Sequence, residues 1–337
     1  MNQFAHGGQV ESFAQQLNCA TEEIIDLSSN INFIKPTVNV DFNELDISSY
    51  PTYTNLYNAI SKNYQVSSNQ IELYNGGSSA IFSLFKHLNL KHCTIYSPAY
   101  LEYKKAATVF KYKISHINRL NIIDQDVEEN SFVIFVNPST PDGQLYDVND
   151  FMQYWMSRDA TILIDESFLD FTNGESMVKY INEYDKLYIL KSMTKFYSSA
   201  GIRVGTLVSS KQNINNLQKN EPMWKLSHFD SIYLQEALKD KTFKNISKSI
   251  NAKNSIYLER ILKESGLFES VLNSNANYML AKLKNMTASQ LQEHLEKDKI
   301  LIRDCENFDF LDNTYVRFAV KSKENLVKLQ HSLSKIS

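Results

Sequence analysis

Short apolar runs, each bounded by turn-forming residues, recur between residues 70 and 210 and alternate with stretches of helical length. The runs are Cys93–Tyr96, Phe132–Val136, Thr161–Ile164, Leu187–Leu190 and Val204–Val208. Apolar runs without polar alternation are typical of strands that are buried on both faces. The pattern therefore predicts a large α/β domain with a mostly parallel sheet flanked by helices, which we place at residues 35–225.

The C-terminal third of the chain has a different pattern. It predicts a helix at about 243–264, a strand at Asn277–Leu283, a helix at about 287–298 and two short strands, ILIR and YVRFAV. A last helix is predicted from apolar residues at spacings of three and four, namely Leu326, Leu329, Leu333 and Ile336. We expect residues 1–34 and 226–337 to form a small α+β domain. It should pack directly against the large one, since the sequence has no long linker.

Composition narrows the class of partner. The 337 residues are 43% apolar and carry a formal net charge of −3, with lysine and arginine scattered along the chain. Such a chain can bury one large core or two modest ones. A basic stripe for nucleic acid or an anionic membrane is missing from the sequence, so a small molecule is the expected partner.

Cysteine usage and the N-terminal sequence bear on location. Cys19, Cys93 and Cys305 are far apart in the sequence, and no Cys or His pair has the spacing of metal ligands. The sequence therefore predicts neither a disulfide framework nor a metal site. The N-terminal stretch lacks the pattern of a signal peptide, and no apolar run approaches the ~18 residues of a membrane span. We expect a cytoplasmic protein.

The first candidate for chemistry is Lys195, in the segment LKSMTKFYSSAGIRVG at Leu190–Gly205. It follows a predicted strand end and is surrounded by hydroxyl residues. A lysine there could act as a nucleophile that forms a Schiff base with an aldehyde cofactor, provided that the site lowers its pKa. Taken alone, an ordinary solvated lysine is the better interpretation.

Asp165 strengthens the functional interpretation. It ends the apolar run TILI, and therefore lies at the carboxyl edge of the predicted sheet, where open α/β folds bind ligands. A buried carboxylate needs a cation, and a protonated pyridine nitrogen would serve. The alternative is the Mg²⁺-holding acid of a nucleotide hydrolase, but the GxxxxGK[ST] loop that this requires is absent from the sequence.

The segment NGGSS at Asn75–Ser79 precedes a helical stretch. Gly77 and Ser78 would place free N–H groups of a helix start where they can bind a phosphate. A plain turn with a helix cap is the alternative for this segment alone. Combined with Arg203 and the hydroxyls of Ser192 and Thr194, it predicts a phosphate site.

Seven sequence blocks carry a family resemblance. They are AHGGQV, LSSNIN at Leu27–Asn32, SYP at Ser49–Pro51, IDESFLDF, LKSMTKFYSSAGIRVG, NANYML and ILIRDCENF with YVRFAV. In this order they resemble pyridoxal 5′-phosphate enzymes of fold type I, in the histidinol-phosphate aminotransferase group. Within that group the chain looks most like threonine-phosphate decarboxylase of cobalamin synthesis. The resemblance implies the aspartate aminotransferase-like fold and covers nearly the whole chain.

The resemblance implies roles for the residues already named. Lys195 would bond the aldehyde of pyridoxal 5′-phosphate, and Asp165 would pair with its ring nitrogen. Tyr100, in SPAYLEY, would stack on the ring. Arg203 and Ser192 would bind the cofactor phosphate, together with Thr194, Gly77 and Ser78. Tyr50 would reach that phosphate from a neighbouring subunit, which implies a homodimer with shared active sites.

The resemblance also implies a substrate site. Arg317, in YVRFAV, would hold an α-carboxylate. Arg303, with His6 and Asn32, would hold a substrate phosphate. Planar guanidinium groups suit both oxyanions. The alternative for each arginine is an exposed residue of a surface strand.

The chain departs from the family in the block NPSTPDG at Asn137–Gly143. Thr140 stands where the family has an asparagine that hydrogen-bonds the cofactor's phenolic oxygen. Phe168 stands where the aminotransferases have a tyrosine, although the decarboxylase has phenylalanine there too. Loss of one such hydrogen bond costs ~0.5–1.5 kcal/mol. The changes are therefore expected to retune the cofactor without abolishing catalysis.

Three functions are compatible with the sequence. The first is a decarboxylase of O-phospho-L-threonine or O-phospho-L-serine. The second is an aminotransferase of the histidinol-phosphate type. The third is a non-catalytic homologue that binds pyridoxal 5′-phosphate.

Overall fold

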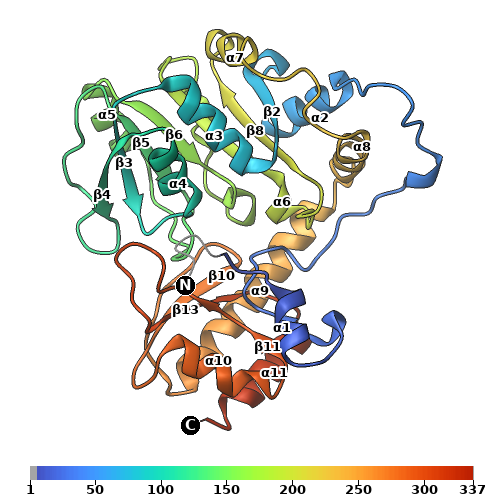
Figure 1. The fold of residues 1–337 in the computed structure, drawn as a ribbon, viewed down its shortest axis with the longest axis vertical. Coiled ribbons are helices and arrows are strands. Elements are labelled where there is room, and N and C mark those ends of the chain that lie inside the picture. The colour runs from blue at the N-terminus through green and yellow to red at the C-terminus, as the bar shows by residue number, and fades with distance from the viewer. Residues whose placement is uncertain (1–5, 337) are drawn as a thin grey trace.

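The computed structural model describes residues 6–336 and has two parts, each built on its own sheet (Figure 1). The AHGGQV block begins at Ala5, which lies outside the described residues. The upper part in Figure 1 holds a seven-stranded sheet in the order β2-β8-β7-β6-β5-β3-β4. The lower part holds a four-stranded sheet, β12-β13-β10-β9, and a two-stranded pair, β1-β11.

The elements of the large part have the following bounds. The strands are β2 Ile71–Asn75, β3 His92–Ser97, β4 Lys113–Asn118, β5 Phe132–Val136, β6 Thr161–Asp165, β7 Leu187–Ser192 and β8 Val204–Ser209. The helices are α2 Thr54–Tyr64, α3 Gly76–Leu88, α4 Glu102–Val109, α5 Asn149–Ser157, α6 Met193–Phe196, α7 Lys211–Gln218 and α8 His228–Ala237. Short 3₁₀ turns are η2 Phe42–Glu44, η3 Ser68–Gln70, η4 Leu169–Phe171 and η5 Met177–Tyr180.

The prediction of a mostly parallel sheet is confirmed. Strands β4, β3, β5, β6 and β7 pair in parallel, and β8 runs antiparallel to both of its neighbours, β7 and β2. All five predicted strands are present. The edge strands β2 and β4 are additional. Edge strands keep polar residues, so they lack a continuous apolar run.

Helices cover both faces of this sheet, as side-chain alternation along the strands requires. Phe132 and Ile134 pack against α3 and α4 on one face, and α7 joins the same core. Val133 and Phe135 face the other way, toward α2, α5 and α8. The carboxyl ends of β5, β6 and β7 therefore emerge between two helical layers.

The elements of the small part have the following bounds. They are α1 Val10–Gln16, η1 Thr21–Glu23, β1 Ile25–Asp26, α9 Phe243–Glu264, β9 Phe268–Val271, β10 Tyr278–Leu283, α10 Ala288–Glu296, β11 Ile300–Leu301, β12 Arg303–Asp304, β13 Tyr315–Ala319 and α11 Lys323–Leu333. The predicted helices and strands of this region are confirmed.

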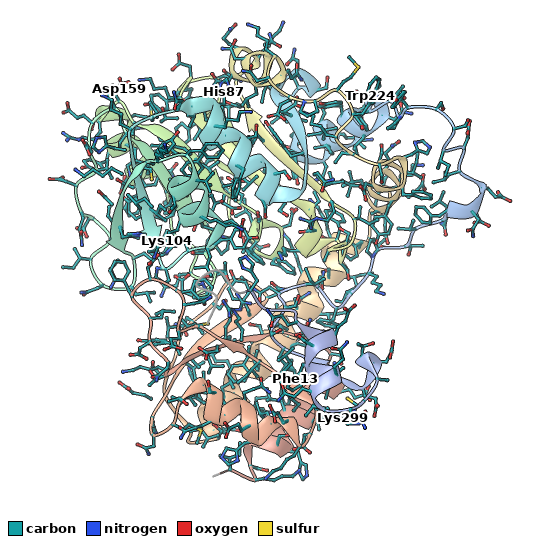
Figure 2. The ribbon with its side chains drawn as sticks, viewed as in Figure 1. Phe13, His87, Lys104, Asp159, Trp224 and Lys299 are labelled. Atoms are coloured by element: carbon teal, nitrogen blue, oxygen red, sulfur yellow. The ribbon has the colours of Figure 1, made fainter. Side chains whose placement is uncertain are left out.

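Alternation along β13 separates the two faces of the small sheet. Val316 and Phe318 pack in the core that α9, α10 and α11 complete. Arg317 lies between them and therefore points to the opposite face, toward the large part. Lys104, labelled in Figure 2 where the two parts meet, pairs with Asp309 of the small part at 2.5 Å.

Residues beyond the predicted boundary at residue 225 still pack in a hydrophobic core of the large sheet. Leu234 and Ala237 of α8 pack in a core of the large sheet, as does Phe243 at the start of α9. Leu258 and Leu262, near the end of α9, pack in the small core. We therefore propose that the two parts divide within α9, which runs from one to the other (Figure 1).

None of the helices within residues 6–336 is long and apolar enough to cross a membrane.

Candidate active site

A cavity of about 250 Å³ lies at the carboxyl edge of the large sheet, against the small part. The structure gathers most of the predicted site residues in its walls. They are His6, Gly77, Ser78, Tyr100, Thr140, Asp165, Ser192, Thr194, Lys195, Arg203, Arg303 and Arg317. The predicted residues Asn32 and Tyr50 do not line it.

Lys195 lies on the short helix α6, directly after strand β7. Burial, followed by the positive charges of Arg317 and Arg203, lowers the pKa of its ammonium group to about 8, whereas the negative charge of Asp165 opposes this shift. A pKa near 8 leaves a substantial neutral fraction at neutral pH. A neutral amine is what a lysine nucleophile requires.

Asp165 ends strand β6 and is 4% exposed. Its Oδ2 accepts a hydrogen bond from the Tyr103 hydroxyl at 2.7 Å, and its Oδ1 accepts from the Ser167 amide at 2.8 Å. Burial raises the pKa of this carboxyl, while the bonds from Ser167 and Tyr103 lower it. Within residues 6–336 no cation lies at ion-pair distance from Asp165. The site therefore offers a buried, oriented carboxylate that a cationic ligand atom could pair with.

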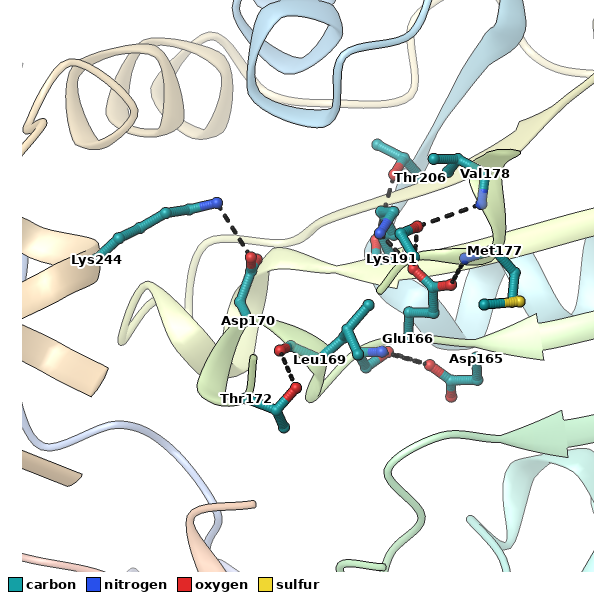
Figure 3. A network of polar contacts seen from close by, with 12 residues as sticks. Asp165, Glu166, Leu169, Asp170, Thr172, Met177, Val178, Lys191, Thr206 and Lys244 are labelled. Carbon is teal, nitrogen blue, oxygen red and sulfur yellow. Dashed lines mark hydrogen bonds and ion pairs between the residues drawn. The ribbon is translucent and has the colours of Figure 1, made fainter. Parts of the chain in front are cut away.

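Glu166, the next residue, points to the other side of the sheet (Figure 3). It pairs with Lys191 of strand β7 at 2.5 Å and accepts a hydrogen bond from the Met177 amide at 2.6 Å. This pair connects strand β6, which ends at Asp165, with strand β7, which precedes Lys195. It therefore fixes the relative positions of the candidate acid and the candidate amine.

The first turn of α3 lies close to the side chain of Arg203. Gly76 has φ +80°, and a Cβ there would lie 2.3 Å from Arg203 Nη2, so only glycine fits. A Cβ on Gly77 would lie 3.5 Å from the Ser192 Cβ. The backbone N–H groups of this turn, the guanidinium and the Ser192 hydroxyl thus lie together. Such a group of donors can bind a phosphate.

Tyr100 lies above this turn. Its hydroxyl is 3.1 Å from Ser78 Oγ, and its ring lies 5.5 Å from the His6 ring. His6 Nε2 in turn is 3.0 Å from Glu102 Oε1. The N-terminal segment is thereby attached to α4 beside the cavity.

Arg317 is 6% exposed and is held by two hydrogen bonds. Its Nη1 donates to Thr140 Oγ1 at 2.6 Å, and its Nη2 donates to the Ser28 carbonyl at 2.7 Å. Within the described part of the chain, its buried Nε has no hydrogen-bond partner. Burial lowers the pKa of Arg317 to about 10. Such a group strongly favours an anion as its ligand.

Arg303 lies directly opposite Arg317, because the two residues are register partners of strands β12 and β13. Side chains at such positions share one face of a sheet. Arg303 Nη2 donates to Asn307 Oδ1 at 2.7 Å, and the guanidinium carbon lies 5.3 Å from the centre of the Phe308 ring. Two arginines from the small sheet thus face the cavity side by side.

Two predicted residues lie elsewhere. The Asn32 amide donates to the Phe196 carbonyl at 2.8 Å and to Ser247 Oγ at 2.6 Å, so it connects α6 to α9. Tyr50 is 73% exposed and stacks on Trp224 at 4.0 Å. Trp224 is labelled in Figure 2 at the outer edge of the large part. A role for Tyr50 in a neighbouring subunit's site remains a prediction.

Sequence reasoning missed Asn30, Tyr103 and Ser167. Asn30 lines the cavity, and its buried Oδ1 has no partner among the described residues. It belongs to the same LSSNIN block as Asn32, so the block pointed to the region without identifying the residue. Tyr103 is the second tyrosine of SPAYLEY. No sequence signal indicated that it, rather than a neighbour, would bond Asp165.

The fold and the cavity define a class of protein, and comparison with known sequences agrees. The chain belongs to the aminotransferase class I and II family, whose model matches residues 14–333. It has the fold of the fold type I enzymes, and it is a pyridoxal 5′-phosphate-dependent enzyme.

The similar proteins include a decarboxylase and an aminotransferase. The chain is 25% identical to threonine-phosphate decarboxylase from Salmonella typhimurium, over 98% of this chain and 96% of the relative. It is 28% identical to the crystal structure of histidinol-phosphate aminotransferase from Clostridium acetobutylicum, with a TM-score of 0.83, covering 93% of this chain and 99% of that one. The adenosylcobalamin biosynthesis bifunctional protein CobDQ from Leptospira interrogans is 28% identical over the whole chain, which spans 41% of that longer protein.

The residues present fit pyridoxal 5′-phosphate. The cavity contains an amine with a lowered pKa, a buried carboxylate that pairs with no cation among residues 6–336, and a group of phosphate donors. These match the aldehyde, the ring nitrogen and the phosphate of the cofactor.

Proposed function

We propose that the protein is a decarboxylase of a phosphorylated amino acid, with O-phospho-L-threonine or O-phospho-L-serine as substrate. One observation carries this proposal, namely the register pairing of Arg303 with Arg317 beside the cavity that contains Lys195. Two guanidinium groups on one face of a short sheet repel each other, and the charge of Arg303 contributes to the lowered pKa of Arg317. Two anionic groups on one ligand would neutralise both.

The two arginines differ in what they offer a ligand. Arg317 is fixed by Thr140 and Ser28 and keeps its Nε free, which suits one carboxylate in a defined orientation. Arg303 lies beside Phe308 and Gly7, nearer the N-terminal segment. We assign the α-carboxylate to Arg317 and the phosphate to Arg303, with His6 as a further phosphate contact.

When bound, pyridoxal 5′-phosphate supplies an aldehyde that bonds amines and a ring that withdraws electrons from Cα of the substrate. Asp165 would hold the positive charge on the ring nitrogen, and Arg203 with the first turn of α3 would hold the phosphate. Arg303 and Arg317 would select the bond of Cα that breaks, because they would fix both anionic ends of the substrate. When the bond to the carboxylate breaks and CO₂ leaves, Cα gains a proton, which the protonated form of Lys195, with a pKa near 8, would donate.

Phe168 favours decarboxylation over amino transfer. It lines the cavity and packs edge-on against Tyr278 at 5.0 Å, so it brings no hydroxyl to the cofactor. Decarboxylases of the family resembled here have phenylalanine at this position. The second candidate function is an aminotransferase of the histidinol-phosphate type, which the likeness to the Clostridium acetobutylicum enzyme supports.

The test is direct. Purified protein with pyridoxal 5′-phosphate is mixed with O-phospho-L-threonine or O-phospho-L-serine, and CO₂ and the amino-alcohol phosphate are measured. Release of both products from either compound supports the proposal. An aminotransferase would instead convert the cofactor to its amine form when an amino donor is added alone. Absence of turnover with every phosphorylated amino acid and donor would leave the non-catalytic alternative.

We also propose a homodimer in which Tyr50 of one subunit contacts the cofactor phosphate of the other. The exposed stack of Tyr50 on Trp224 supports this, because large exposed aromatic residues are typical of interfaces. Trp224→Glu is expected to yield monomers by light scattering and to weaken cofactor binding. Ile256→Glu, at a 68% exposed position of α9, is the matched control and should leave both unchanged.

A further inference from the structure

A buried ion pair lies behind the loop at Asn137–Gly143, which contains Thr140 and follows strand β5. Neither residue of the pair lines the cavity. Arg119 Nε is 3.4 Å from Asp142 Oδ2, and both side chains are completely buried. Neither carboxylate oxygen of Asp142 has a well-aligned hydrogen bond within residues 6–336, nor do Nε and Nη2 of Arg119. An apolar pair of similar size would usually be at least as stable as such an ion pair. Its presence therefore needs an explanation other than stability.

Arg119 connects the two ends of the loop. Its Nη1 donates to the Val136 carbonyl at 2.8 Å, where strand β5 ends and the loop begins. Its charge attracts Asp142 near the end of the same loop. The guanidinium carbon lies over the rings of Phe135 and Tyr146, at 4.8 and 5.0 Å from their centres. Arg119 thus spans the loop from behind.

Thr140 lies between the two points that Arg119 holds, and on the cavity side it touches Arg317. The Thr140 hydroxyl accepts the Arg317 Nη1 hydrogen bond at 2.6 Å. Tyr278 supports the loop from the small sheet, since its hydroxyl donates to the Ser139 carbonyl at 2.7 Å. The orientation of the Arg317 guanidinium therefore depends on where the loop places the Thr140 hydroxyl, together with the Ser28 carbonyl.

We propose that Arg119 and Asp142 are positioning residues that fix Thr140 against Arg317, and thereby set how the site orients the carboxylate of its substrate. Neither residue touches the substrate. This inference rests on the proposed role of Arg317 in binding a carboxylate. It explains a costly buried charge pair by the orientation that the pair imposes on the loop. Burial, opposed by Arg119, raises the pKa of Asp142 to about 6, in keeping with a carboxylate kept ionised there at a cost.

The first experiment needs no substrate. Crystal structures of the wild type and Asp142→Asn holoenzymes are compared at the Thr140–Arg317 contact. We expect the variant to lose this hydrogen bond, because Arg119 no longer attracts the end of the loop. A retained contact would overturn the inference. Arg119→Met/Asp142→Asn, which carries no buried charge at this place, tests the same point if the single variant does not fold.

The second experiment measures ligand selection. Spectral titration of the holoenzyme gives dissociation constants for O-phospho-L-threonine and for the phosphate ester of 1-amino-2-propanol, which lacks the carboxylate. Asp142→Asn should weaken the first about tenfold or more and leave the second within about twofold, as expected for loss of one charged hydrogen bond. Equal weakening of both ligands would contradict a role in carboxylate orientation.

A matched control separates positioning from stability. Lys225 and Glu72 also form a buried ion pair in the large part, with side-chain exposures of 10% and 2%, and neither lines the cavity. Glu72→Gln should destabilise the fold without changing the preference between the two ligands. If the wild type binds neither ligand, the proposed function fails, and the crystal comparison alone decides the positioning inference.

Discussion

The lowered pKa of Lys195 can be tested without any cofactor. The structure gives a pKa of about 8, caused first by burial and then by Arg317 and Arg203. At about pH 7.5 an amine with this pKa is about one quarter neutral, whereas an ordinary lysine with a pKa of about 10.4 is neutral in about one molecule in a thousand. Only the neutral form attacks an aldehyde. At this pH Lys195 should therefore react roughly 200 times faster than it would with the pKa of an ordinary exposed lysine.

The assay is reductive methylation of the cofactor-free protein with formaldehyde and cyanoborohydride. Peptide mass spectrometry follows the label at Lys195 across a pH series, with exposed lysines of the same digest as internal references. The labelling rate should rise with pH and level off above about pH 8. Arg317→Gln removes one of the nearby positive charges that lower the pKa of Lys195, and it should raise the pH at which labelling is half-maximal.

Two results would refute the reasoning. One is a midpoint for Lys195 that coincides with that of the exposed lysines. The other is a midpoint that stays in place when the Arg317 charge is removed, since this would exclude the electrostatic cause. Slow labelling at all pH values would mean that the reagents reach Lys195 poorly. The quantity compared is therefore the pH of half-maximal labelling and not the absolute rate.

Three further predictions concern the acid, the phosphate site and the buried pair. Asp165→Asn removes the charge opposite the expected ring nitrogen and should weaken cofactor binding about 10- to 100-fold in equilibrium dialysis, as loss of a charged hydrogen bond does; unchanged affinity would exclude the pairing. Arg203→Gln should weaken the cofactor similarly but leave the affinity for pyridoxal, which has no phosphate, unchanged, while Arg158→Gln at the surface should affect neither. Asp142 has its pKa raised to about 6 in the folded state, so the native protein binds more protons than the unfolded chain between about pH 4 and 6. Its free energy of unfolding should therefore fall as pH rises through this window, by on the order of 3 kcal/mol from this group, and urea denaturation should find this slope absent in Asp142→Asn.

The central sheet could be predicted because its strands are covered on both faces. Phe132–Val136 and residues 162–164 of strand β6 are entirely buried, so their sequences are continuous apolar runs. Strand β4 is an edge strand with alternating exposed residues, and β2 carries the buried Glu72, whose charge is compensated by Lys225. Polar residues of that kind interrupt the pattern. Their partners come from distant segments that the local sequence does not reveal.

The site could be predicted where chemistry restricts the residue type. A nucleophilic amine, a carboxylate at a strand end and a glycine turn before a helix each have a local signature, and Lys195, Asp165 and Gly77 all line one cavity. Asn32 and Asn30 are two residues apart and chemically identical, so only the path of the chain separates them. Tyr103 and the Arg119–Asp142 pair act through contacts far apart in sequence. Such contacts are visible only in the folded structure.

Helix α9 contributes side chains to the hydrophobic cores of both parts. Its first residue is buried among side chains of the large sheet and its last turns are buried beneath the small one, so a single rigid rod of 22 residues is common to both. A cut after residue 225 would leave α8 on the wrong fragment and would expose apolar surface on both pieces. Neither fragment should fold on its own, and loss of either core should unfold the whole chain in one cooperative transition.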